Sequence, residues 1–225
     1  MIDGLVVVMP TLDAASGLGT TLLALGDQAT RTVVVDGGSR DATGEIAMAH
    51  GAALISAPRG RGPQLAAGAR AAAEARWLLF LHADTRLDPG WQASVAAHIS
   101  APDAENRAAY FTLAFDDPRP MARLWEWLAA WRCRVLALSY GDQGLLISRV
   151  LYDRIGGFAP LPLMEDVDLV RRLGRKRLQA LSIRAVTSAA RYRRGYLRRG
   201  LRNLLCLGLW YLGAKPATVQ RLYAG

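Results

Sequence analysis

The feature that most constrains the fold is a regular alternation, in the first hundred residues, of short apolar runs with segments of helical length. Runs without polar alternation are typical of strands that are buried on both faces, as in a parallel sheet. The intervening segments have helical length, and the last of them begins with Asp88-Pro89, a typical helix start. The expected strands are residues 5–9, 32–36, 52–55 and 77–81, and the expected helices are 16–28, 41–50, 63–76 and 88–99. This order predicts an α/β fold with right-handed crossovers and helices on both faces of the sheet.

The second half is less regular. We expect strands at 110–115 and 144–148 and helices at 121–138 and 165–173. Leucines at helical spacing over residues 197–209, with Arg198 and Arg202 on another side, predict a basic amphipathic helix. The predicted organisation is therefore a mixed, mostly parallel sheet domain over residues 1–190, followed by a C-terminal helical segment over residues 191–225.

Composition and charge limit the function. The chain has 225 residues, of which 52% are hydrophobic and 21% charged, which excludes a disordered or collagen-like protein. Residues 1–168 hold 14 Lys and Arg against all 19 Asp and Glu, whereas residues 169–225 hold 14 basic residues and no acidic residue. Such a split is typical of a surface that meets phosphates, in a nucleotide, in lipid headgroups or in nucleic acid.

The apolar runs also bear on location. The first run is too short for a signal peptide, and the longest late run, residues 204–214, is half of the ~20 residues that a spanning helix needs. We therefore expect a cytoplasmic protein.

Polar and glycine-rich segments follow each of the four predicted strands. In a parallel α/β sheet the ligand binds beyond the carboxyl ends of the strands, so these segments are expected to share one site. They are residues 10–13, 36–43, 59–64 and 82–85.

The segment after the second strand, Asp36-Gly-Gly-Ser-Arg-Asp-Ala-Thr43, resembles the V-D-D-G-S-x-D-x-T stretch of family-two glycosyltransferases of the GT-A fold. Four further segments resemble that family in the same order. They are Val7 to Asp13 (the opening strand ending in P-x-x-N-E), Leu81 to Thr85 (the strand ending in D-x-D), Gly141-Asp-Gln-Gly144 (the acceptor-side loop) and Met164-Glu165-Asp166 (the E-D pair). The resemblance covers roughly residues 4–173 and is closest to small bacterial stand-alone members labelled arsenosugar-biosynthesis-type glycosyltransferases.

The resemblance implies an inverting transferase that moves a sugar from a nucleotide-diphospho-sugar to a hydroxyl or lipid-phosphate acceptor. It implies Mg²⁺ or Mn²⁺ as cofactor and no nucleic-acid partner. The expected donor-binding residues are Pro10, Thr11, Asp13, Asp36, Gly38, Arg61, Gln64, His82, Ala83 and Gln143.

Each donor-side assignment has a structural alternative. Asp36 can accept hydrogen bonds from a base or ribose, or it can simply begin a turn while Asp41 caps the next helix. Arg61 and Gln64 lie at a helix start, where a guanidinium can hold a base or phosphate, although a solvated basic loop explains them equally. Asp142 and Gln143 lie between glycines and can contact the acceptor or donor sugar, and a simple turn explains them almost as well.

Asp84 is the candidate metal ligand, because a hard cation that bridges two phosphates needs only one or two protein carboxylates. Here His82 replaces the first aspartate of the family's motif. His82 can ligate the metal, donate to the diphosphate, or pack at the strand end.

Asp166 is the candidate general base, with Glu165 beside it, because inverting transfer needs a carboxylate near the acceptor hydroxyl. Repulsion among Glu165, Asp166 and Asp168 would raise at least one pKa. An acidic first helical turn that complements the helix dipole is the alternative explanation.

Three further interpretations remain open from the sequence. Trp125, Trp127 and Trp131 are expected in the core or in a cleft wall. The C-terminal helix either lies on an anionic membrane or packs on the domain with a solvated basic face, and arginines of residues 191–194 are candidates to approach the diphosphate. The rival functions are a nucleotidyltransferase, whose glycine-rich, lysine-containing loop is missing after the first strand, and a non-catalytic basic adaptor for membrane or nucleic acid, which leaves the acidic half unexplained.

Overall fold

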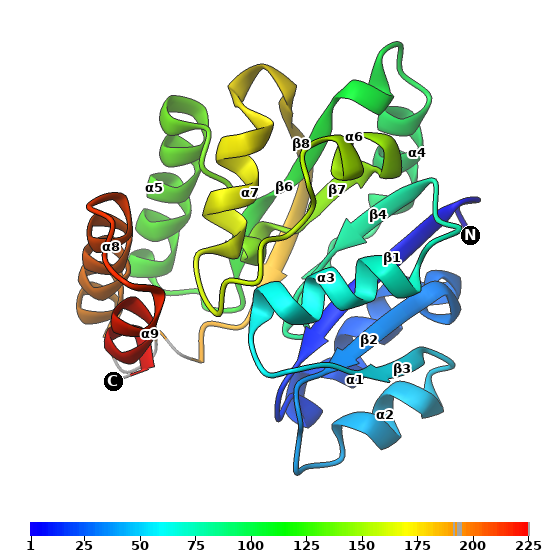
Figure 1. The fold of residues 1–225 in the computed structure, drawn as a ribbon, viewed down its shortest axis with the longest axis horizontal. Coiled ribbons are helices and arrows are strands. Elements are labelled where there is room, and N and C mark those ends of the chain that lie inside the picture. Colours follow the sequence, from blue (N-terminus) through cyan, green and yellow to red (C-terminus); the bar gives the residue numbers. More distant parts are fainter. Residues whose placement is uncertain (191, 193–194, 225) are drawn as a thin grey trace.

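The computed structural model describes residues 1–190, 192 and 195–224, and it shows one sheet with helices on both faces (Figure 1). The strand order across the sheet is β3-β2-β1-β4-β7-β6-β8-β5. The strands are β1 (Leu5–Thr11), β2 (Thr32–Asp36), β3 (Ala53–Ser56), β4 (Trp77–Phe80), β5 (Thr85–Leu87), β6 (Ala108–Phe115), β7 (Leu145–Ser148) and β8 (Leu178–Thr187). The α-helices are α1 (Ala15–Leu25), α2 (Thr43–Ala49), α3 (Arg61–Ala71), α4 (Trp91–Ile99), α5 (Pro120–Leu136), α6 (Arg149–Arg154), α7 (Glu165–Leu173), α8 (Tyr196–Tyr211) and α9 (Pro216–Ala224).

The first four strands form the predicted parallel half of the sheet. β1 pairs with β2 on one side and with β4 on the other, so that Val7 lies opposite Thr32 and Val8 opposite Phe80. β3 extends the sheet beyond β2 in the same direction. The chain order therefore reverses between β1 and β4, which is where open α/β sheets bind their ligands.

Alternate residues of β1 supply two separate cores. Met9 packs with Leu22 of α1 and Trp91 of α4 on one face, and Val8 packs with Leu65 of α3 on the other. α3 approaches the sheet closely at Gly68, where a Cβ atom would lie 2.3 Å from the Cγ1 of Val8. The absence of a side chain at this position sets the distance between helix and sheet.

The second half makes the sheet mixed. β7 is antiparallel to β4 and β6, while β6 and β8 are parallel and β5 is antiparallel to β8. Within the described residues, four of the seven pairings are parallel. The prediction of a mixed, mostly parallel sheet with helices on both faces is confirmed, whereas β5 and β8 were not predicted.

The C-terminal helices pack against the sheet domain. Gly200 of α8 lies against the ring of Trp125 of α5, and a Cβ atom there would be 1.8 Å from the ring's Cη2. Cys206 of α8 and Val219 of α9 are buried in one cluster with Val167 of α7. The described part of the predicted segment 191–225 thus continues the packing of residues 1–190.

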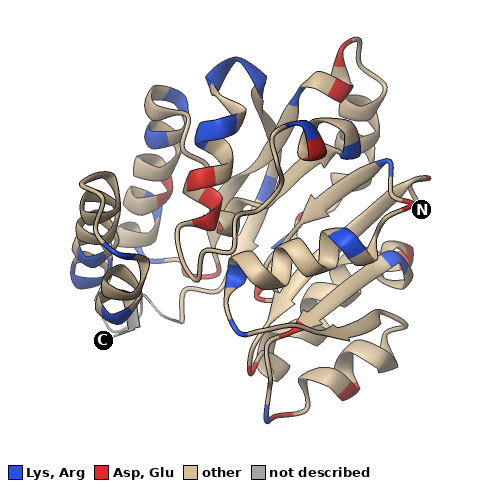
Figure 2. Ribbon diagram, viewed as in Figure 1, with Lys and Arg blue, Asp and Glu red and all other residues tan. Residues whose placement is uncertain are grey.

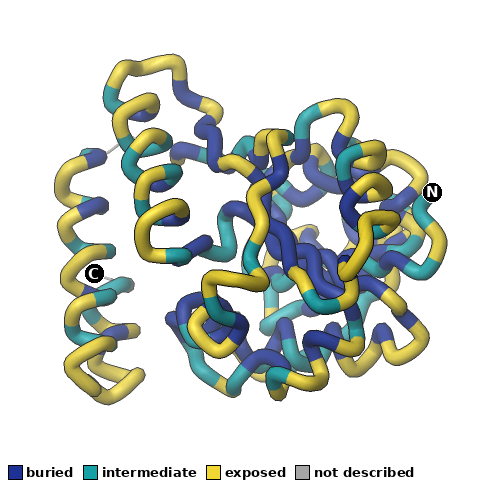
Figure 3. Tube along the Cα trace, turned by 90° about the horizontal axis from the view of Figure 1, so that it is seen from above, coloured by how far each residue is buried: buried dark blue, intermediate teal, exposed yellow. Residues whose placement is uncertain are grey.

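The leucine row of α8 faces away from that contact. Leu197, Leu201, Leu204 and Leu205 are between 54% and 65% exposed, and Figure 3 shows exposed positions along the outer side of this helix, at the far left. The packing face of α8 is formed instead by Tyr196, Gly200 and Cys206, which are buried. The basic amphipathic helix is present, and its apolar stripe is the exposed one.

The tryptophans of α5 do not share one environment. Trp125 packs in a cluster with Phe115 and Tyr196, but Trp127 is 62% exposed and Trp131 is 48% exposed. The expectation of core or cleft-wall tryptophans is therefore wrong for Trp127 and Trp131, which point to solvent because they lie on the side of α5 opposite its buried row. Within the described residues, no helix has both the length and the apolarity to cross a membrane.

Candidate active site

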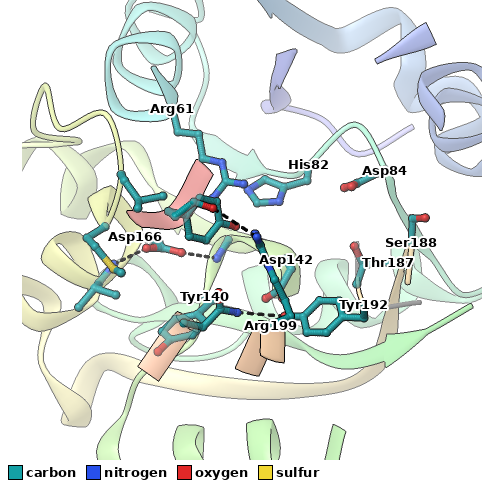
Figure 4. Close-up of a pocket in the computed structure, with 16 residues that line it drawn as sticks. Arg61, His82, Asp84, Tyr140, Asp142, Asp166, Thr187, Ser188, Tyr192 and Arg199 are labelled. Atoms are coloured by element: carbon teal, nitrogen blue, oxygen red, sulfur yellow. Dashed lines mark hydrogen bonds between the residues drawn. The ribbon is translucent and has the colours of Figure 1, made fainter. Parts of the chain in front are cut away.

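A cavity of about 100 Å³ lies beyond the ends of β4 and β8, where the starts of α3 and α7 meet the C-terminal helices (Figure 4). It collects side chains from segments that lie far apart in the sequence. Among its lining residues are Arg61, His82, Asp84, Tyr140, Gly141, Asp142, Asp166, Thr187, Ser188, Tyr192, Arg199, Asn203 and Tyr223. Four residues predicted from the sequence, Arg61, His82, Asp84 and Asp166, are thus brought to one hollow.

Asp166 is held in place by backbone donors. Its Oδ2 accepts a hydrogen bond from the Gly141 N–H at 2.7 Å, and its Oδ1 accepts one from the Val167 N–H at 2.7 Å. The residue lies in the first turn of α7, where the helix dipole stabilises a carboxylate. The acidic-turn interpretation is therefore correct as structure, and it also places a charged oxygen at the cavity wall.

His82 lies against the turn that carries Gly141. A Cβ atom at Gly141 would be 2.6 Å from the His82 Nε2, so only glycine leaves room for this imidazole. Figure 4 shows the His82 ring beside the guanidinium of Arg61, with both side chains on the cavity. This position allows His82 either to donate to a phosphate or to ligate a metal.

Asp84 follows β4, and its carboxylate faces the cavity (Figure 4). The described residues contain no group of three or more His, Cys, Asp or Glu side chains placed to hold a metal ion. One carboxylate with one imidazole nearby fits a Mg²⁺ or Mn²⁺ ion whose remaining ligands are substrate phosphates and water. It does not fit a metal held by the protein alone.

Within the loop Gly141-Asp-Gln-Gly144 it is Asp142 that faces the cavity. Its Oδ1 is buried and has no hydrogen-bond partner. Burial raises the pKa of Asp142 to about 6; Asp166 and Asp84 add to this rise, and Arg132 and Arg61 oppose it. The sequence allows a sugar contact for Asp142 or for Gln143, and of the two only Asp142 lines the cavity.

The side chain of Gln143 stabilises the turn through hydrogen bonds. Its Oε1 accepts from the Arg132 Nη2 at 3.0 Å and from the Tyr140 N–H at 3.3 Å, and its Nε2 donates to the Phe111 carbonyl at 3.1 Å. The side chain is buried and does not line the cavity. The turn interpretation accounts for Gln143, and the predicted donor contact does not follow from its position.

Glu165 is directed away from the cavity that Asp166 faces. It is 1% exposed, both of its carboxyl oxygens are buried without a partner, and it borders a second cavity of about 20 Å³ beside Leu65 and Phe80. Burial raises the pKa of Glu165 to about 8; the charge of Asp166 adds to this rise and Arg61 opposes it. Glu165 is therefore mostly neutral at pH 7, and its position behind Asp166 gives the predicted catalytic contact no support.

The loops after β1 and β2 are locked together around Asp36. Its Oδ1 accepts from the Thr11 Oγ1 at 3.1 Å, and its Oδ2 accepts from the N–H groups of Gly38 and Ser39 at 3.0 and 2.8 Å. Burial raises the pKa of Asp36, but these hydrogen bonds outweigh it and the net pKa is lowered. Asp36 thus begins a turn, and its lowered pKa keeps its carboxyl group ionised at the end of β2.

The same two loops are joined at their tips. Asp13 Oδ1 accepts from the Arg40 N–H at 2.8 Å, and the Asp13 N–H donates to the Ser39 Oγ at 2.9 Å. Asp41 Oδ2 accepts from the Ala15 N–H at 3.0 Å. The predicted donor-side residues of both loops therefore form one rigid rim, which lies outside the 100 Å³ cavity.

Gln64 braces this rim from below. Its Nε2 donates to the carbonyls of Thr11 and Val35 at 2.7 and 2.8 Å, and the residue is buried. Pro10 lies within β1, and the Ala83 carbonyl accepts from the Thr21 hydroxyl at 2.9 Å. These three predicted residues shape the backbone at the strand ends and do not line the cavity.

The residues that sequence reasoning missed come mainly from the C-terminal segment. Tyr192, Arg199, Asn203 and Tyr223 line the cavity. The excess of basic residues pointed to this segment, but the leucine spacing drew attention to the opposite face of α8. Arg191, Arg193 and Arg194, the other arginines considered for the diphosphate, lie outside the described residues.

Comparisons with known proteins identify the family and the fold of the chain. Residues 6–162 match the family model described as glycosyl transferase family 2. Glucosyl-3-phosphoglycerate synthase from Mycobacterium tuberculosis, solved with Mn²⁺, UDP and phosphoglyceric acid, is 18% identical over 94% of this chain and 79% of that chain, with a TM-score of 0.61. The same enzyme with Mn²⁺, UDP-glucose and phosphoglyceric acid is 21% identical over 79% of this chain and 69% of that one, with a TM-score of 0.53. TarS (residues 1–349) from S. aureus with UDP-GlcNAc is 15% identical over 98% of this chain and 70% of that one, with a TM-score of 0.57.

No curated protein matches the chain significantly. The solved structures, at such low identity, confirm the GT-A (Rossmann-like) fold, and the family model covers well over half of the sequence. The chain belongs to glycosyl transferase family 2 and is a glycosyltransferase.

Proposed function

We propose that the protein is a metal-dependent, inverting glycosyltransferase that moves a sugar from a nucleotide-diphospho-sugar to a hydroxyl or lipid-phosphate acceptor. The observation that carries the proposal is that Asp84 and Asp166, from the end of β4 and the start of α7, face one cavity beyond the sheet. The similar solved enzymes were crystallised with UDP, UDP-glucose or UDP-GlcNAc, which supports a UDP-sugar as the first donor to test. We propose further that, within the family, the protein is one of the small bacterial members labelled arsenosugar-biosynthesis-type glycosyltransferases.

Asp166 acts as the general base in this proposal. The acceptor oxygen attacks the anomeric carbon as its proton passes to the Asp166 carboxylate, and the bond from that carbon to the diphosphate oxygen breaks. The nucleoside diphosphate leaves with the electron pair. Hydrogen bonds from Gly141 and Val167 keep the carboxylate oriented, so little reorganisation is needed during the reaction. A lipid-phosphate acceptor, whose oxygen is already anionic, would need less help from the base.

The leaving diphosphate requires neutralisation. A bound Mg²⁺ or Mn²⁺ ion supplies positive charge to it, and Asp84 is the residue that would hold the ion, with His82 beside it. His82 lines the same wall as Asp84 and can donate to a phosphate oxygen. Asp36 and Asp13, on the rigid rim of the β1 and β2 loops, are the proposed contacts to the nucleoside.

A thermal-shift panel with UDP-, GDP-, dTDP- and CDP-sugars tests the donor, because a ligand that binds the folded state raises its apparent stability. We expect a rise in melting temperature for one nucleotide class with Mn²⁺ present. The Asp84→Asn variant should lose this Mn²⁺-dependent rise, whereas Asp88→Asn, which removes an ion pair with Arg184 away from the cavity, should keep it. No shift with any donor in either metal state would contradict the proposal.

We also propose that the protein binds the cytoplasmic face of an anionic membrane through α8. Four exposed leucines form the outer stripe of this helix, with Arg198 and Arg202 on its flank, and no acidic residue occurs from residue 169 onward. Figure 2 shows Lys and Arg along α8 and α5. An exposed apolar stripe beside cationic side chains fits a helix that lies in the headgroup region of anionic lipids.

A further inference from the structure

We infer that the C-terminal helices complete an acceptor subsite in which Arg61 and Arg199 hold a phosphate or carboxylate group of the acceptor. This inference rests on the proposed transferase function and names the chemical class of its acceptor. It assigns a binding role to residues beyond position 162, where the match to the family ends.

The two arginines approach one aromatic ring from different helices. The Cζ of Arg61, the first residue of α3, lies 5.9 Å from the centroid of the Tyr223 ring, and the Cζ of Arg199 of α8 lies 4.2 Å from it. The Arg199 Nη1 also donates to the Tyr223 carbonyl at 3.4 Å. Tyr223 of α9 therefore holds both guanidinium groups at the wall of the cavity.

Within the described part of the chain, neither guanidinium group of this pair forms a salt bridge. The Nε of Arg199 is buried without a hydrogen-bond partner, as is the Oδ1 of Asn203, one turn further along α8. Buried polar atoms are normally paired, and two guanidinium groups at one cavity form the geometry that binds phosphate and carboxylate oxygens.

The position of the pair favours the acceptor over the donor. Burial lowers the pKa of Arg61, but the hydroxyl group of Tyr223 and the carboxyl groups of Glu165 and Asp166 outweigh this effect and raise it. Arg61 therefore lies in the electrostatic field of the general base, which must be close to the acceptor hydroxyl. The donor diphosphate would instead be neutralised by the metal ion that Asp84 is proposed to hold.

The subsite admits two kinds of acceptor with the same chemistry. A soluble phosphomonoester would enter it directly from water, and a lipid phosphate would reach it from the membrane surface. Both carry a dianionic phosphate group that two arginines can hold, whereas a neutral polyol carries no such group.

Isothermal titration on the full chain tests the subsite, with Mn²⁺ and the nucleotide that gives the largest thermal shift already bound. The probes are glycerol 3-phosphate, dioctanoyl phosphatidic acid and neutral glycerol. We expect saturable binding of at least one phosphate compound and none of glycerol. Stronger binding of glycerol 3-phosphate would identify a soluble acceptor, and stronger binding of the phosphatidic acid a lipid acceptor.

Substitutions of single arginines then test where the phosphate probe binds. Arg199→Gln should weaken binding of the phosphate probe by about tenfold or more while changing the nucleotide dissociation constant by less than about twofold. The affinity of Arg199→Lys for the phosphate probe should lie between those of Arg199→Gln and wild type. Arg221→Gln, which removes an exposed charge of α9 outside the cavity, is the matched control and should match wild type.

Two results would overturn the inference. One is an equal loss of nucleotide and phosphate-probe affinity in Arg199→Gln, which would assign the arginines to the donor. The other is binding of phosphate probes that is absent, or unchanged by the substitution, while the nucleotide still binds. Failure of wild type to bind any nucleotide would instead contradict the proposed function, so the two failures are distinguishable.

Discussion

Adjacent carboxyl groups in this site have different environments because the first turn of α7 points them in different directions. Asp166 accepts two backbone hydrogen bonds at the cavity wall, whereas Glu165 lies among apolar side chains with neither oxygen paired. The sequence predicts three acidic residues in one turn and a raised pKa for at least one of them. It does not predict which one, because that depends on which side chain points under the helix.

The buried Glu165 should make stability depend on pH. Its folded pKa of about 8 lies above 4.5, the ordinary pKa of a glutamate side chain, so the folded state binds more protons between these values. The stabilisation associated with this proton is present below about pH 4.5 and is lost as the pH rises towards 8. We expect Glu165→Gln to be more stable than wild type at pH 8 by about 1–4 kcal/mol, with no such gain at pH 4, in urea unfolding at both pH values. An equal effect at both would contradict the assignment.

Gly141 should control the position of His82. Because a Cβ atom at Gly141 would lie 2.6 Å from the imidazole Nε2, Gly141→Ala must displace the ring. We expect kcat/KM to fall by about tenfold or more with the melting temperature within a few degrees of wild type. Gly208→Ala on α8, where a Cβ atom meets nothing within 4 Å, should leave kcat/KM unchanged. Equal kinetics in the two variants would show that His82 has no part in the reaction.

At this scale the sequence predicted the residues that a motif places at strand ends or helix starts, such as His82, Asp84 and Asp166. It predicted Asp142 and Gln143 together and did not separate them, because the direction of a side chain in a tight turn is set by neighbours such as Arg132 and Tyr140. Such contacts are made by tertiary packing and have no local signal.

Among the elements, α8 has two faces in different environments. Its inner face carries Arg199 and Asn203 to the cavity and buries Gly200 against Trp125. Its outer face carries the exposed leucines. A membrane bound to the outer face would therefore lie within one helix diameter of the cavity, about 10 Å.

The outer face of α8 should bind anionic membranes. The double variant Leu201→Asp/Leu205→Asp removes apolar area and adds negative charge at exposed positions, so we expect its co-flotation with phosphatidylglycerol vesicles to fall by about tenfold with little change in melting temperature. Val150→Asp, at an equally exposed apolar residue of α6, is the control and should float like wild type. Flotation that persists in the double variant would contradict membrane binding through this face.

Elements with local signals were predicted and elements held by distant partners were not. The four parallel strands have continuous apolar runs, and each lies within a residue or two of its predicted position. β8 has few buried residues and pairs with β6 through a register shift between Phe111 and Thr112, so its sequence carries neither an apolar run nor a regular alternation. Its place in the sheet depends on strands far away in the chain.

In the whole molecule, the sheet sets the site and the C-terminal helices close it. The chain order reverses between β1 and β4, and the residues after β4 supply His82 and Asp84. The C-terminal helices then add Arg199, Asn203 and Tyr223 to the cavity wall. The motifs of the sequence predicted that Asp84 and Asp166 belong to this arrangement, and the C-terminal side was indicated only by an unassigned excess of basic charge.

The central claim is that Asp84 and Asp166 serve one glycosyl-transfer site. Release of nucleoside diphosphate from the best-binding sugar donor, in the presence of Mn²⁺ and an acceptor, measures this most directly. We expect turnover by wild type, a loss of about 10²–10⁴-fold in kcat for Asp166→Asn with donor binding retained, and wild-type rates for Asp168→Asn, whose carboxylate pairs with Arg172 outside the cavity. Full turnover by Asp166→Asn, or no turnover by wild type with any donor that binds, would contradict the claim.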